Sequence, residues 1–307
     1  MRPPHLLLLL LGGLITSTSS GELVRGISAS SFENNDPKFA CSWVRPQEYY
    51  IKKLNELGFN YLRLPFSAEY INRGDFTGMD ETFRLCQQYN LSVLIDYHRT
   101  HGSHQGNFDE TNLNDFLHVW KKVIDRYKQN DVLQGIGLYN EYQGTDATYW
   151  NNIMNVSVMN IEHYTPNRFW YSVGCKRWSG DCSEINLEHL DFRDRIRYEI
   201  HKYSFSGSGT KEDWDLSFGP FPEKIIVGEW GYLSENKDQS KWADRFVDYL
   251  IQRNIRSSFF WDLAISSDTN GLWKNDCLTL EEEKLKVIKR LWGDEIKPEN
   301  QWIIDIP

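Results

Sequence analysis

The sequence has no excess of basic residues, and this deficit excludes several classes of partner. Its 307 residues include 34 Lys and Arg against 43 Asp and Glu, so the formal net charge is −9 and the pI is about 5.4. Nucleic-acid-binding domains need a basic face that neutralises phosphates, and anionic membrane surfaces attract the same residues. Neither nucleic acid nor a membrane is therefore expected as a partner.

Long apolar runs are also missing, apart from one near the N-terminus. Arg2 is followed by the apolar run Leu6–Ile15 and then by small residues at 16–21. This order is typical of a secretory signal peptide cut near residue 20, and the run is too short to cross a bilayer. The alternative is a buried N-terminal helix. We expect a signal peptide over 1–20 and secretion to the extracellular space.

Linkers, low-complexity tracts and sequence repeats are absent after about residue 21, where the composition stays even. A chain of this length suffices for one α/β barrel or for two smaller domains. The even composition favours a single domain over 21–307, and we expect it to be a monomer.

Cysteine is sparse, with five residues, and the odd number leaves at least one of them outside any intramolecular disulfide. Their spacings do not resemble those of zinc sites, so neither a metal nor another cofactor is expected. Cys175 and Cys182 are close enough to close one loop, and secretion permits disulfides. The triplets Asn90-Leu91-Ser92 and Asn155-Val156-Ser157 are possible glycan acceptors, as in a secreted glycoprotein.

What the sequence does contain is a regular alternation of element types. Short runs rich in Ile, Val, Leu, Tyr and Phe are typical of strands buried on both faces, and the segments between them have helical periodicity. Eight such runs predict an α/β protein with a single (β/α)8 TIM barrel. The alternative, a doubly wound open sheet, would favour a glycine-rich phosphate loop where Gly26-Ile27-Ser28 stands. The eight runs are Leu23–Ser28, Asn60–Phe66, Leu91–His98, Leu133–Asn140, Arg168–Gly174, Arg197–Tyr203, Lys224–Glu229 and Arg256–Trp261.

Three segments show the helical periodicity most clearly, namely 45–57, 112–129 and 280–292. The fifth crossover, 175–196, is the least helical, and we expect it to begin with a long loop.

Polar and ionisable side chains gather where these predicted strands end. In a barrel, the carboxyl ends of all strands meet at one rim, where active sites lie. Burial of an ionisable group at the end of an apolar strand costs free energy, so such groups are usually paired with another charge or have a function. A cluster of them on one rim therefore indicates a site. Its members are Arg63, His98, Asn140, Glu141, His201, Tyr203, Glu229 and Trp261.

Two glutamates within this cluster suit the hydrolysis of a glycosidic bond. Glu141 follows the fourth run and Glu229 ends the seventh, which are equivalent places in the barrel. Such hydrolysis requires one protonated carboxyl group that releases the leaving oxygen and one ionised group that attacks the anomeric carbon. Arg63 beside Glu229 would keep the nucleophile ionised. For a single glutamate, a helix cap or a rim salt bridge is the alternative.

With these residues in place, the chain resembles glycoside hydrolase family 5 over roughly residues 22–295, and most closely its secreted cellulases. Each motif is weak alone, but six occur in the family's order on the expected strands. They are Leu62-Arg63-Leu64-Pro65, Asp96-Tyr97-His98, Tyr139-Asn140-Glu141, His201-Lys202-Tyr203, Gly228-Glu229-Trp230-Gly231 and Phe260-Trp261.

The resemblance implies roles for the supporting residues. Asn140 would bond the sugar 2-hydroxyl, and His98 would bond other hydroxyls. Tyr203 would hold Glu229, and His201 would support Glu141 or the sugar. Trp261 would stack under the sugar at the cleavage site. A purely structural role in the core is the alternative for the two histidines and the tryptophan.

The substrate that the resemblance implies is β-1,4-glucan, cleaved with retention through a covalent glycosyl-enzyme. Asp268-Thr269-Asn270-Gly271-Leu272 is similar to a loop of the secreted cellulases. The chain departs from the family at Tyr142, which replaces the usual proline and offers a possible stacking face, and in a short first loop, Ala29–Ser42. Mannan, β-1,3-glucan or a glycolipid as substrate remains an alternative, as does a non-catalytic carbohydrate-binding protein or a recognition ectodomain.

Barrel closure suggests one further contact. Cys41 lies in the loop after the first strand and Cys277 in the loop after the eighth, and these strands are neighbours in a closed barrel. We therefore expect a Cys41–Cys277 disulfide, which leaves Cys86 as a buried thiol.

Overall fold

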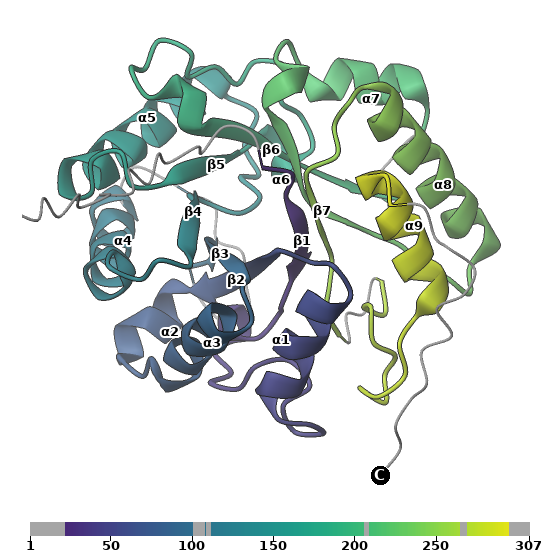
Figure 1. The fold of residues 1–307 in the computed structure, drawn as a ribbon. Coiled ribbons are helices and arrows are strands. Elements are labelled where there is room, and N and C mark those ends of the chain that lie inside the picture. The colour runs from purple at the N-terminus through teal and green to yellow at the C-terminus, as the bar shows by residue number, and fades with distance from the viewer. Residues whose placement is uncertain (1–21, 101–107, 109–111, 206–208, 265–268, 295–307) are drawn as a thin grey trace, which may run out of the picture.

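The computed structural model describes residues 22–100, 108, 112–205, 209–264 and 269–294. Within these ranges, eight parallel strands form a closed barrel in the order β1 to β8, as the sequence predicts (Figure 1). The strands are β1 (Arg25–Ser28), β2 (Tyr61–Ser67), β3 (Ser92–Arg99), β4 (Leu133–Gly137), β5 (Trp170–Gly174), β6 (Ile196–Tyr203), β7 (Ile225–Gly231) and β8 (Ser258–Phe260).

The barrel closes through the pairing of its first and last strands. Gly26 of β1 is opposite Tyr61 of β2 on one side and Phe259 of β8 on the other. The site for Gly26 is tight, because a Cβ atom there would lie 2.2 Å from the ring of Phe259. Glycine therefore allows the closing strands to approach each other.

Helices connect the strands and surround the barrel as an outer ring (Figure 1). Each of the longer helices buries one stripe; in α4 this stripe includes Phe116, Trp120, Ile124 and Tyr127. The helices are α1 (Gln47–Glu56), α2 (Ala68–Arg73), α3 (Thr77–Gln88), α4 (Leu113–Tyr127), α5 (Ala147–Tyr164), α6 (Lys176–Ser179), α7 (Lys211–Phe218), α8 (Lys237–Gln252) and α9 (Glu282–Trp292).

The interior of the barrel changes from apolar to charged along its axis. Toward the amino ends of the strands, a separate apolar cluster fills the interior; it consists of Val24, Tyr61, Leu94, Trp170, Ile226 and Phe259. Because side chains alternate along a strand, residues two positions further on also point inward. Arg63, Asp96 and Ser172 follow members of the cluster in this way. They belong to a polar layer that lies directly above the apolar cluster.

Two predicted elements differ in detail. The predicted strand Leu133–Asn140 ends at Gly137, although the Asn140 amide still donates to the Tyr97 carbonyl at 2.9 Å, so the chain continues beside β3. The fifth crossover is indeed the least helical. Its helix α6 has four residues, and Arg177, Trp178 and Ser179 have positive φ angles of 53°, 56° and 53°.

Both expected disulfides are present. Cys41 is bonded to Cys277 across 236 residues of sequence, and Cys175 is bonded to Cys182 across 7. Cys86 is the buried thiol, as predicted. The first bridge joins the loops that follow β1 and β8, on either side of the line where the barrel closes.

The expected signal peptide and Asp268 of the cellulase-like loop lie outside the described residues. Among the residues that the structure does describe, no helix combines the length and apolar character that a bilayer crossing requires.

The long disulfide should contribute most to stability through the unfolded chain, because it closes a loop of more than two hundred residues. By loop-closure entropy, we expect the double variant Cys41→Ser/Cys277→Ser to lose about 5 kcal/mol of unfolding free energy, measured by chemical denaturation. The matched control is Cys175→Ser/Cys182→Ser, for which the same relation gives about 2.5 kcal/mol. Equal losses in the two variants would contradict this account.

Candidate active site

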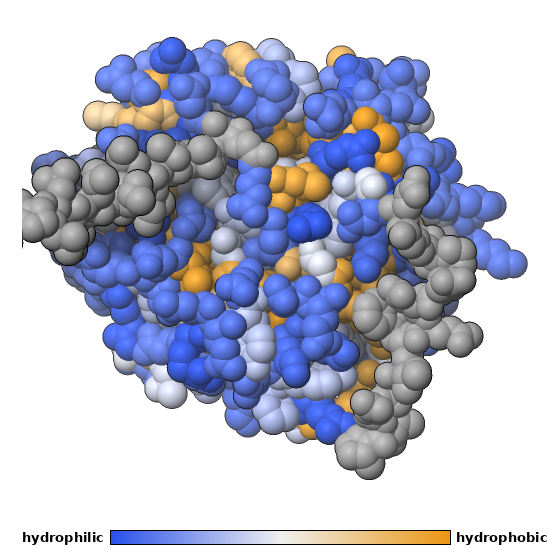
Figure 2. All heavy atoms as spheres, viewed as in Figure 1, coloured by the Kyte–Doolittle hydropathy of each residue, from blue (hydrophilic) through white to orange (hydrophobic). Residues whose placement is uncertain are grey.

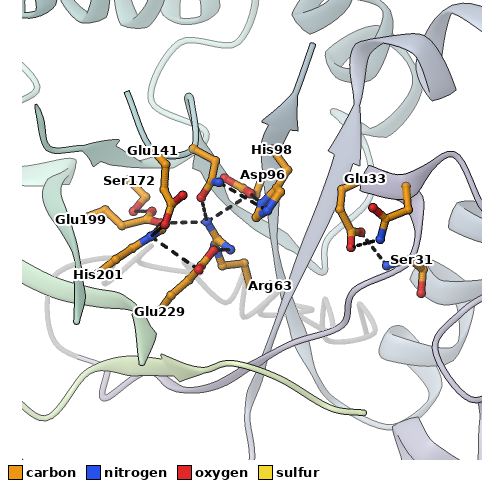
Figure 3. A network of polar contacts seen from close by, with 12 residues as sticks. Ser31, Glu33, Arg63, Asp96, His98, Glu141, Ser172, Glu199, His201 and Glu229 are labelled. Carbon is orange, nitrogen blue, oxygen red and sulfur yellow. Dashed lines mark hydrogen bonds and ion pairs between the residues drawn. The ribbon is translucent and has the colours of Figure 1, made fainter. Parts of the chain in front are cut away.

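Arg63 is the centre of the polar layer. It is 0% exposed and donates to three acceptors: Nη1 to Glu229 Oε1 at 2.7 Å, and Nη2 to Glu199 Oε1 and Asn140 Oδ1, both at 2.9 Å (Figure 3). The Asp96 carboxylate lies 3.1 Å from the same Nη2. Burial alone would lower the pKa of Arg63, but the surrounding carboxylates outweigh it and raise this pKa above its usual value. The guanidinium is therefore a permanent cation.

A bulge in β7 places Glu229 on this cation. Between β6 and β7 the register shifts by one residue, so that Ile200 is opposite Val227 while His201 is opposite Glu229. The extra residue is Gly228, and a bulge of this kind re-aims the side chain that follows. Tyr203 of β6 donates its hydroxyl hydrogen to Glu229 Oε2 at 2.7 Å. Both oxygens of Glu229 therefore accept from inward-pointing donors.

Glu141 lies close to Glu229, and both carboxyl groups are near the same nitrogen of His201. The backbone of Glu141 is left-handed, with φ of 51°, just after the chain leaves β4. His201 Nδ1 lies 2.9 Å from Glu141 Oε1 and 3.5 Å from Glu229 Oε2. One carboxylate oxygen of each glutamate and a nitrogen of His201 all lie within 4.8 Å of one another. Glu141 is more exposed than Glu229, so the two carboxyl groups have different environments.

His98 forms the other wall with Asp96 and Asn140. His98 Nδ1 is 2.8 Å from Asp96 Oδ2, and its Nε2 is 3.3 Å from Asn140 Nδ2. This arrangement suits a neutral ring that donates through Nδ1 and accepts through Nε2. Burial lowers the pKa of His98 to about 3, which agrees with a neutral ring. The Trp261 ring lies parallel to His98, with centroids 5.3 Å apart.

A cavity of about 1120 Å³ opens above these groups and extends toward α6 and α7. Its lining near the glutamates includes His98, Tyr203 and Trp261. Further out, the lining includes Trp178 and Phe205, which are 54% and 58% exposed. In the space-filling view, the face shown is largely hydrophilic, with apolar patches set among polar side chains near its middle (Figure 2).

Trp178 is presented by the left-handed turn of α6. Its amide donates to the Tyr142 carbonyl at 2.8 Å, and the Arg177 amide donates to the Gly144 carbonyl at 3.1 Å. The Cys175–Cys182 disulfide closes the same turn. The indole therefore has a fixed backbone beneath it despite its exposure.

Tyr142 corrects one expectation. We considered it as a stacking face for substrate, but it is only 7% exposed and its ring stacks on Trp150 with centroids 4.1 Å apart. The residue that replaces the family's proline therefore anchors its own loop to α5 and, through its carbonyl, supports the turn that carries Trp178.

All eight residues predicted for the site lie around this cavity or directly beneath it. Sequence reasoning missed Glu199 and Trp178 and gave Asp96 no role. For Glu199 there was a signal, because it lies two residues before His201 on β6 and so shares its inward face. For Trp178 there was none, because consecutive left-handed residues other than glycine are not encoded by a recognisable pattern.

Among the described residues, the one set of metal-ligand types that converges closely is Glu141, His201 and Glu229. Both ring nitrogens of His201 contact carboxylate oxygens, Nδ1 that of Glu141 and Nε2 that of Glu199. Burial alone would lower the pKa of His201, but the neighbouring glutamates raise it to about 10. A protonated imidazole has no lone pair for a metal, so the donor set does not suit one.

Comparison with known proteins shows which family the chain matches. Residues 23–267 match the sequence model of the cellulase family, glycosyl hydrolase family 5. The chain is 24% identical to the major extracellular endoglucanase of Xanthomonas campestris pv. campestris, over 89% of this chain and 69% of that protein. It is 23% identical to an endoglucanase of Paenibacillus polymyxa, over 81% of this chain and 77% of that protein.

Among solved structures, an endocellulase variant from Pyrococcus horikoshii in complex with cellotetraose has the same fold. Its TM-score is 0.78 at 20% identity, with 88% of this chain and 93% of that one covered. The two chains therefore share a fold at low sequence identity.

We expect Arg63→Met to destabilise the fold by about 3–5 kcal/mol at pH 7, because three buried carboxyl groups lose their cation. Arg63 lowers the folded pKa values of Asp96 and Glu199, so its loss raises both. The destabilisation is therefore largest above the raised folded values and shrinks as pH falls below them. Chemical denaturation at pH 4 and pH 7 measures the difference.

The matched control is Arg84→Met on the surface of α3, where Arg84 pairs with the exposed Glu81. This variant should lose less than about 1 kcal/mol of unfolding free energy at both pH values. An Arg63 variant whose destabilisation does not depend on pH would contradict the electrostatic role.

Proposed function

Because the chain belongs to family 5 of the glycosyl hydrolases, the cellulase family, we propose that it hydrolyses β-1,4-linked glucan with Glu229 as nucleophile and Glu141 as acid/base. The chain is a glycoside hydrolase of the retaining type. The observation that carries the residue assignment is the approach of the two carboxyl groups to within 4.8 Å. Retaining enzymes have their carboxyl groups about 5 Å apart, whereas inverting enzymes leave room for a water molecule.

In the first step, Glu229 attacks the anomeric carbon. Arg63 and Tyr203 both donate to its oxygens, and these two hydrogen bonds fix the orientation of the attacking carboxylate. As the bond from the anomeric carbon to the glycosidic oxygen breaks, Glu141 transfers its proton to that oxygen. The leaving sugar departs with the proton, and the glycosyl group remains bonded to Glu229.

In the second step, water replaces the leaving sugar. Glu141, now a carboxylate, takes a proton from the water as its oxygen attacks the anomeric carbon, and the bond to Glu229 breaks. Glu229 has lost its charge while it carries the sugar, so charge repulsion no longer opposes the carboxylate form of Glu141 that this step needs.

The remaining rim residues fit the positioning of a sugar in front of Glu229. Asn140 already bonds Arg63 through its oxygen, so its amide nitrogen faces His98. The half-buried Trp261 ring offers an apolar face held by His98. Stacking of a sugar on an aromatic face with hydrogen bonds from its edge is the usual mode of carbohydrate binding in such a cleft.

Glucan as the substrate is supported by two observations. The relatives reported above are named as endoglucanases. The cavity also continues from the glutamates past Trp178 and Phe205, whose exposed aromatic faces suit further sugar units of a chain. A site for a single small glycoside would not need this extension.

We also propose that the protein is secreted. The leader-like residues 1–20 support this, as do two disulfides, which persist in oxidising compartments. The Xanthomonas relative is named as extracellular.

The proposed substrate is tested by initial rates on carboxymethylcellulose, mannan and laminarin, with proton NMR of the first anomer released. We expect the highest rate on carboxymethylcellulose and the β-anomer as the first product. A faster rate on mannan or laminarin would reassign the glycan. Early release of the α-anomer would overturn the retaining assignment.

Alanine substitutions of the two glutamates should have different effects on activity. Glu229→Ala should lose at least about 10⁴-fold in kcat, with partial rescue by azide, which takes the place of the missing nucleophile. Glu141→Ala should lose about 10²–10⁴-fold on glucan but little of the first step on aryl glycosides with good leaving groups, which need no proton. Equal losses on both substrates in Glu141→Ala would remove it from the acid role.

A further inference from the structure

Glu199 is a buried carboxylate that the two-step reaction does not use. It lies on β6, two residues before His201, and is 2% exposed beneath the cavity floor. Its Oε1 accepts from Arg63 Nη2 and contacts His201 Nε2, each at 2.9 Å, and Ser172 donates to its Oε2 (Figure 3). A charge this deeply buried is retained only where its partners are well placed.

The backbone leaves room for this carboxylate. A Cβ atom on Gly228 would lie 2.2 Å from Glu199 Oε1 and 2.3 Å from its Cδ, so a larger residue there would displace the group. Gly228 is also the bulge residue that turns Glu229 inward. The same residue therefore accommodates Glu199 and positions the proposed nucleophile.

The hydrogen-bond pattern determines where the protons on His201 lie. Burial alone would raise the pKa of Glu199, but Arg63 and His201 outweigh it and lower this pKa to about 2, so Glu199 is an anion. An anion only accepts, and His201 Nε2 must therefore carry a hydrogen. The remaining ring nitrogen, Nδ1, then faces Glu141 Oε1 with a single proton between the two atoms.

That shared proton has two positions. Either His201 is an imidazolium beside an ionised Glu141, or His201 is neutral and accepts from a protonated Glu141. A negative charge on Glu199 favours the first arrangement, because it stabilises the imidazolium. The first step of the reaction requires the second arrangement, or one further proton on the pair.

We propose that Glu199 is a positioning residue that keeps a hydrogen on His201 Nε2, and thereby sets the pH above which Glu141 no longer holds the proton that the first step consumes. The role given to Glu141 rests on the proposed function, whereas the protonation of His201 does not. Glu199 itself does not touch the substrate and acts through His201.

Several charged and titratable groups surround His201, and each contributes to its protonation. Glu229 and Glu141 favour the charged ring, as Glu199 does, while the buried Arg63 repels it. By strand, the groups are Arg63 on β2, Asp96 and His98 on β3, Glu141 after β4, Glu199 and Tyr203 on β6, and Glu229 on β7. Among those that hydrogen-bond to the ring, Glu199 is the one that lies beneath the reaction centre.

The test is Glu199→Gln, which keeps the shape of the side chain and an oxygen acceptor for Arg63 and His201. With the negative charge removed, the neutral ring becomes more favourable, and Glu141 keeps its proton to higher pH. We expect the alkaline limb of the kcat/KM profile to move up by about one pH unit. The KM at the optimum should change little.

The matched control is Ser172→Ala, which removes another hydrogen bond from Glu199 but leaves its charge and its contact with His201. Its pH profile should coincide with that of the unaltered protein. A shift of the limb in this control as large as that in Glu199→Gln would mean that general disturbance of the buried layer causes it, and would overturn the proposal.

Nitrogen-15 NMR of His201 provides a readout that does not depend on activity. In the unaltered protein, Nε2 should be protonated throughout the pH range of activity, and in Glu199→Gln the ring should lose its charge at lower pH. An unaltered protein whose His201 has an unprotonated Nε2 would overturn the proposal even if the variant fails to fold. Absence of hydrolysis on every glycan would instead overturn the proposed function and leave this titration standing.

Discussion

The ion cluster around Arg63 is the interaction on which the rest of the site depends. Its guanidinium binds the carboxylates of Glu199 and Glu229 and the amide oxygen of Asn140, and it lies beside Asp96, all in a buried layer. Four strands, β2, β3, β6 and β7, contribute the ionic groups. Without a central cation, three buried anions would repel one another and favour an open barrel. The same contacts that compensate for burial also aim Glu229.

The apolar side chains below this layer strengthen the interactions among its charged groups. Tyr61, Leu94 and Trp170 fill the barrel toward the amino ends of the strands, so that apolar side chains lie directly beneath the ions. Charges in such surroundings interact over longer range than charges at a surface. This explains why two histidines at one rim have opposite protonation. The pKa of His98 is lowered to about 3 by burial, whereas that of His201 is raised to about 10 by carboxylates that outweigh the same effect.

Much of this arrangement could be predicted from the sequence. Eight apolar runs were enough for the barrel, since strands buried on both faces need no finer pattern, and the polar residues at their ends identified the rim. The β7 bulge was not predictable, because strict alternation from Ile226 would turn Glu229 away from Arg63. The final position of Tyr142 depended on Trp150 of α5, a contact between segments whose relative placement no local pattern contains.

Closure through β1 and the three residues of β8 has a consequence for synthesis. During translation β1 is made first, yet one of its edges has no partner until the last strand has left the ribosome. An unpaired strand edge is a template for association with other chains. Any chain that terminates before Ser258 would therefore leave that edge of β1 without its β8 partner.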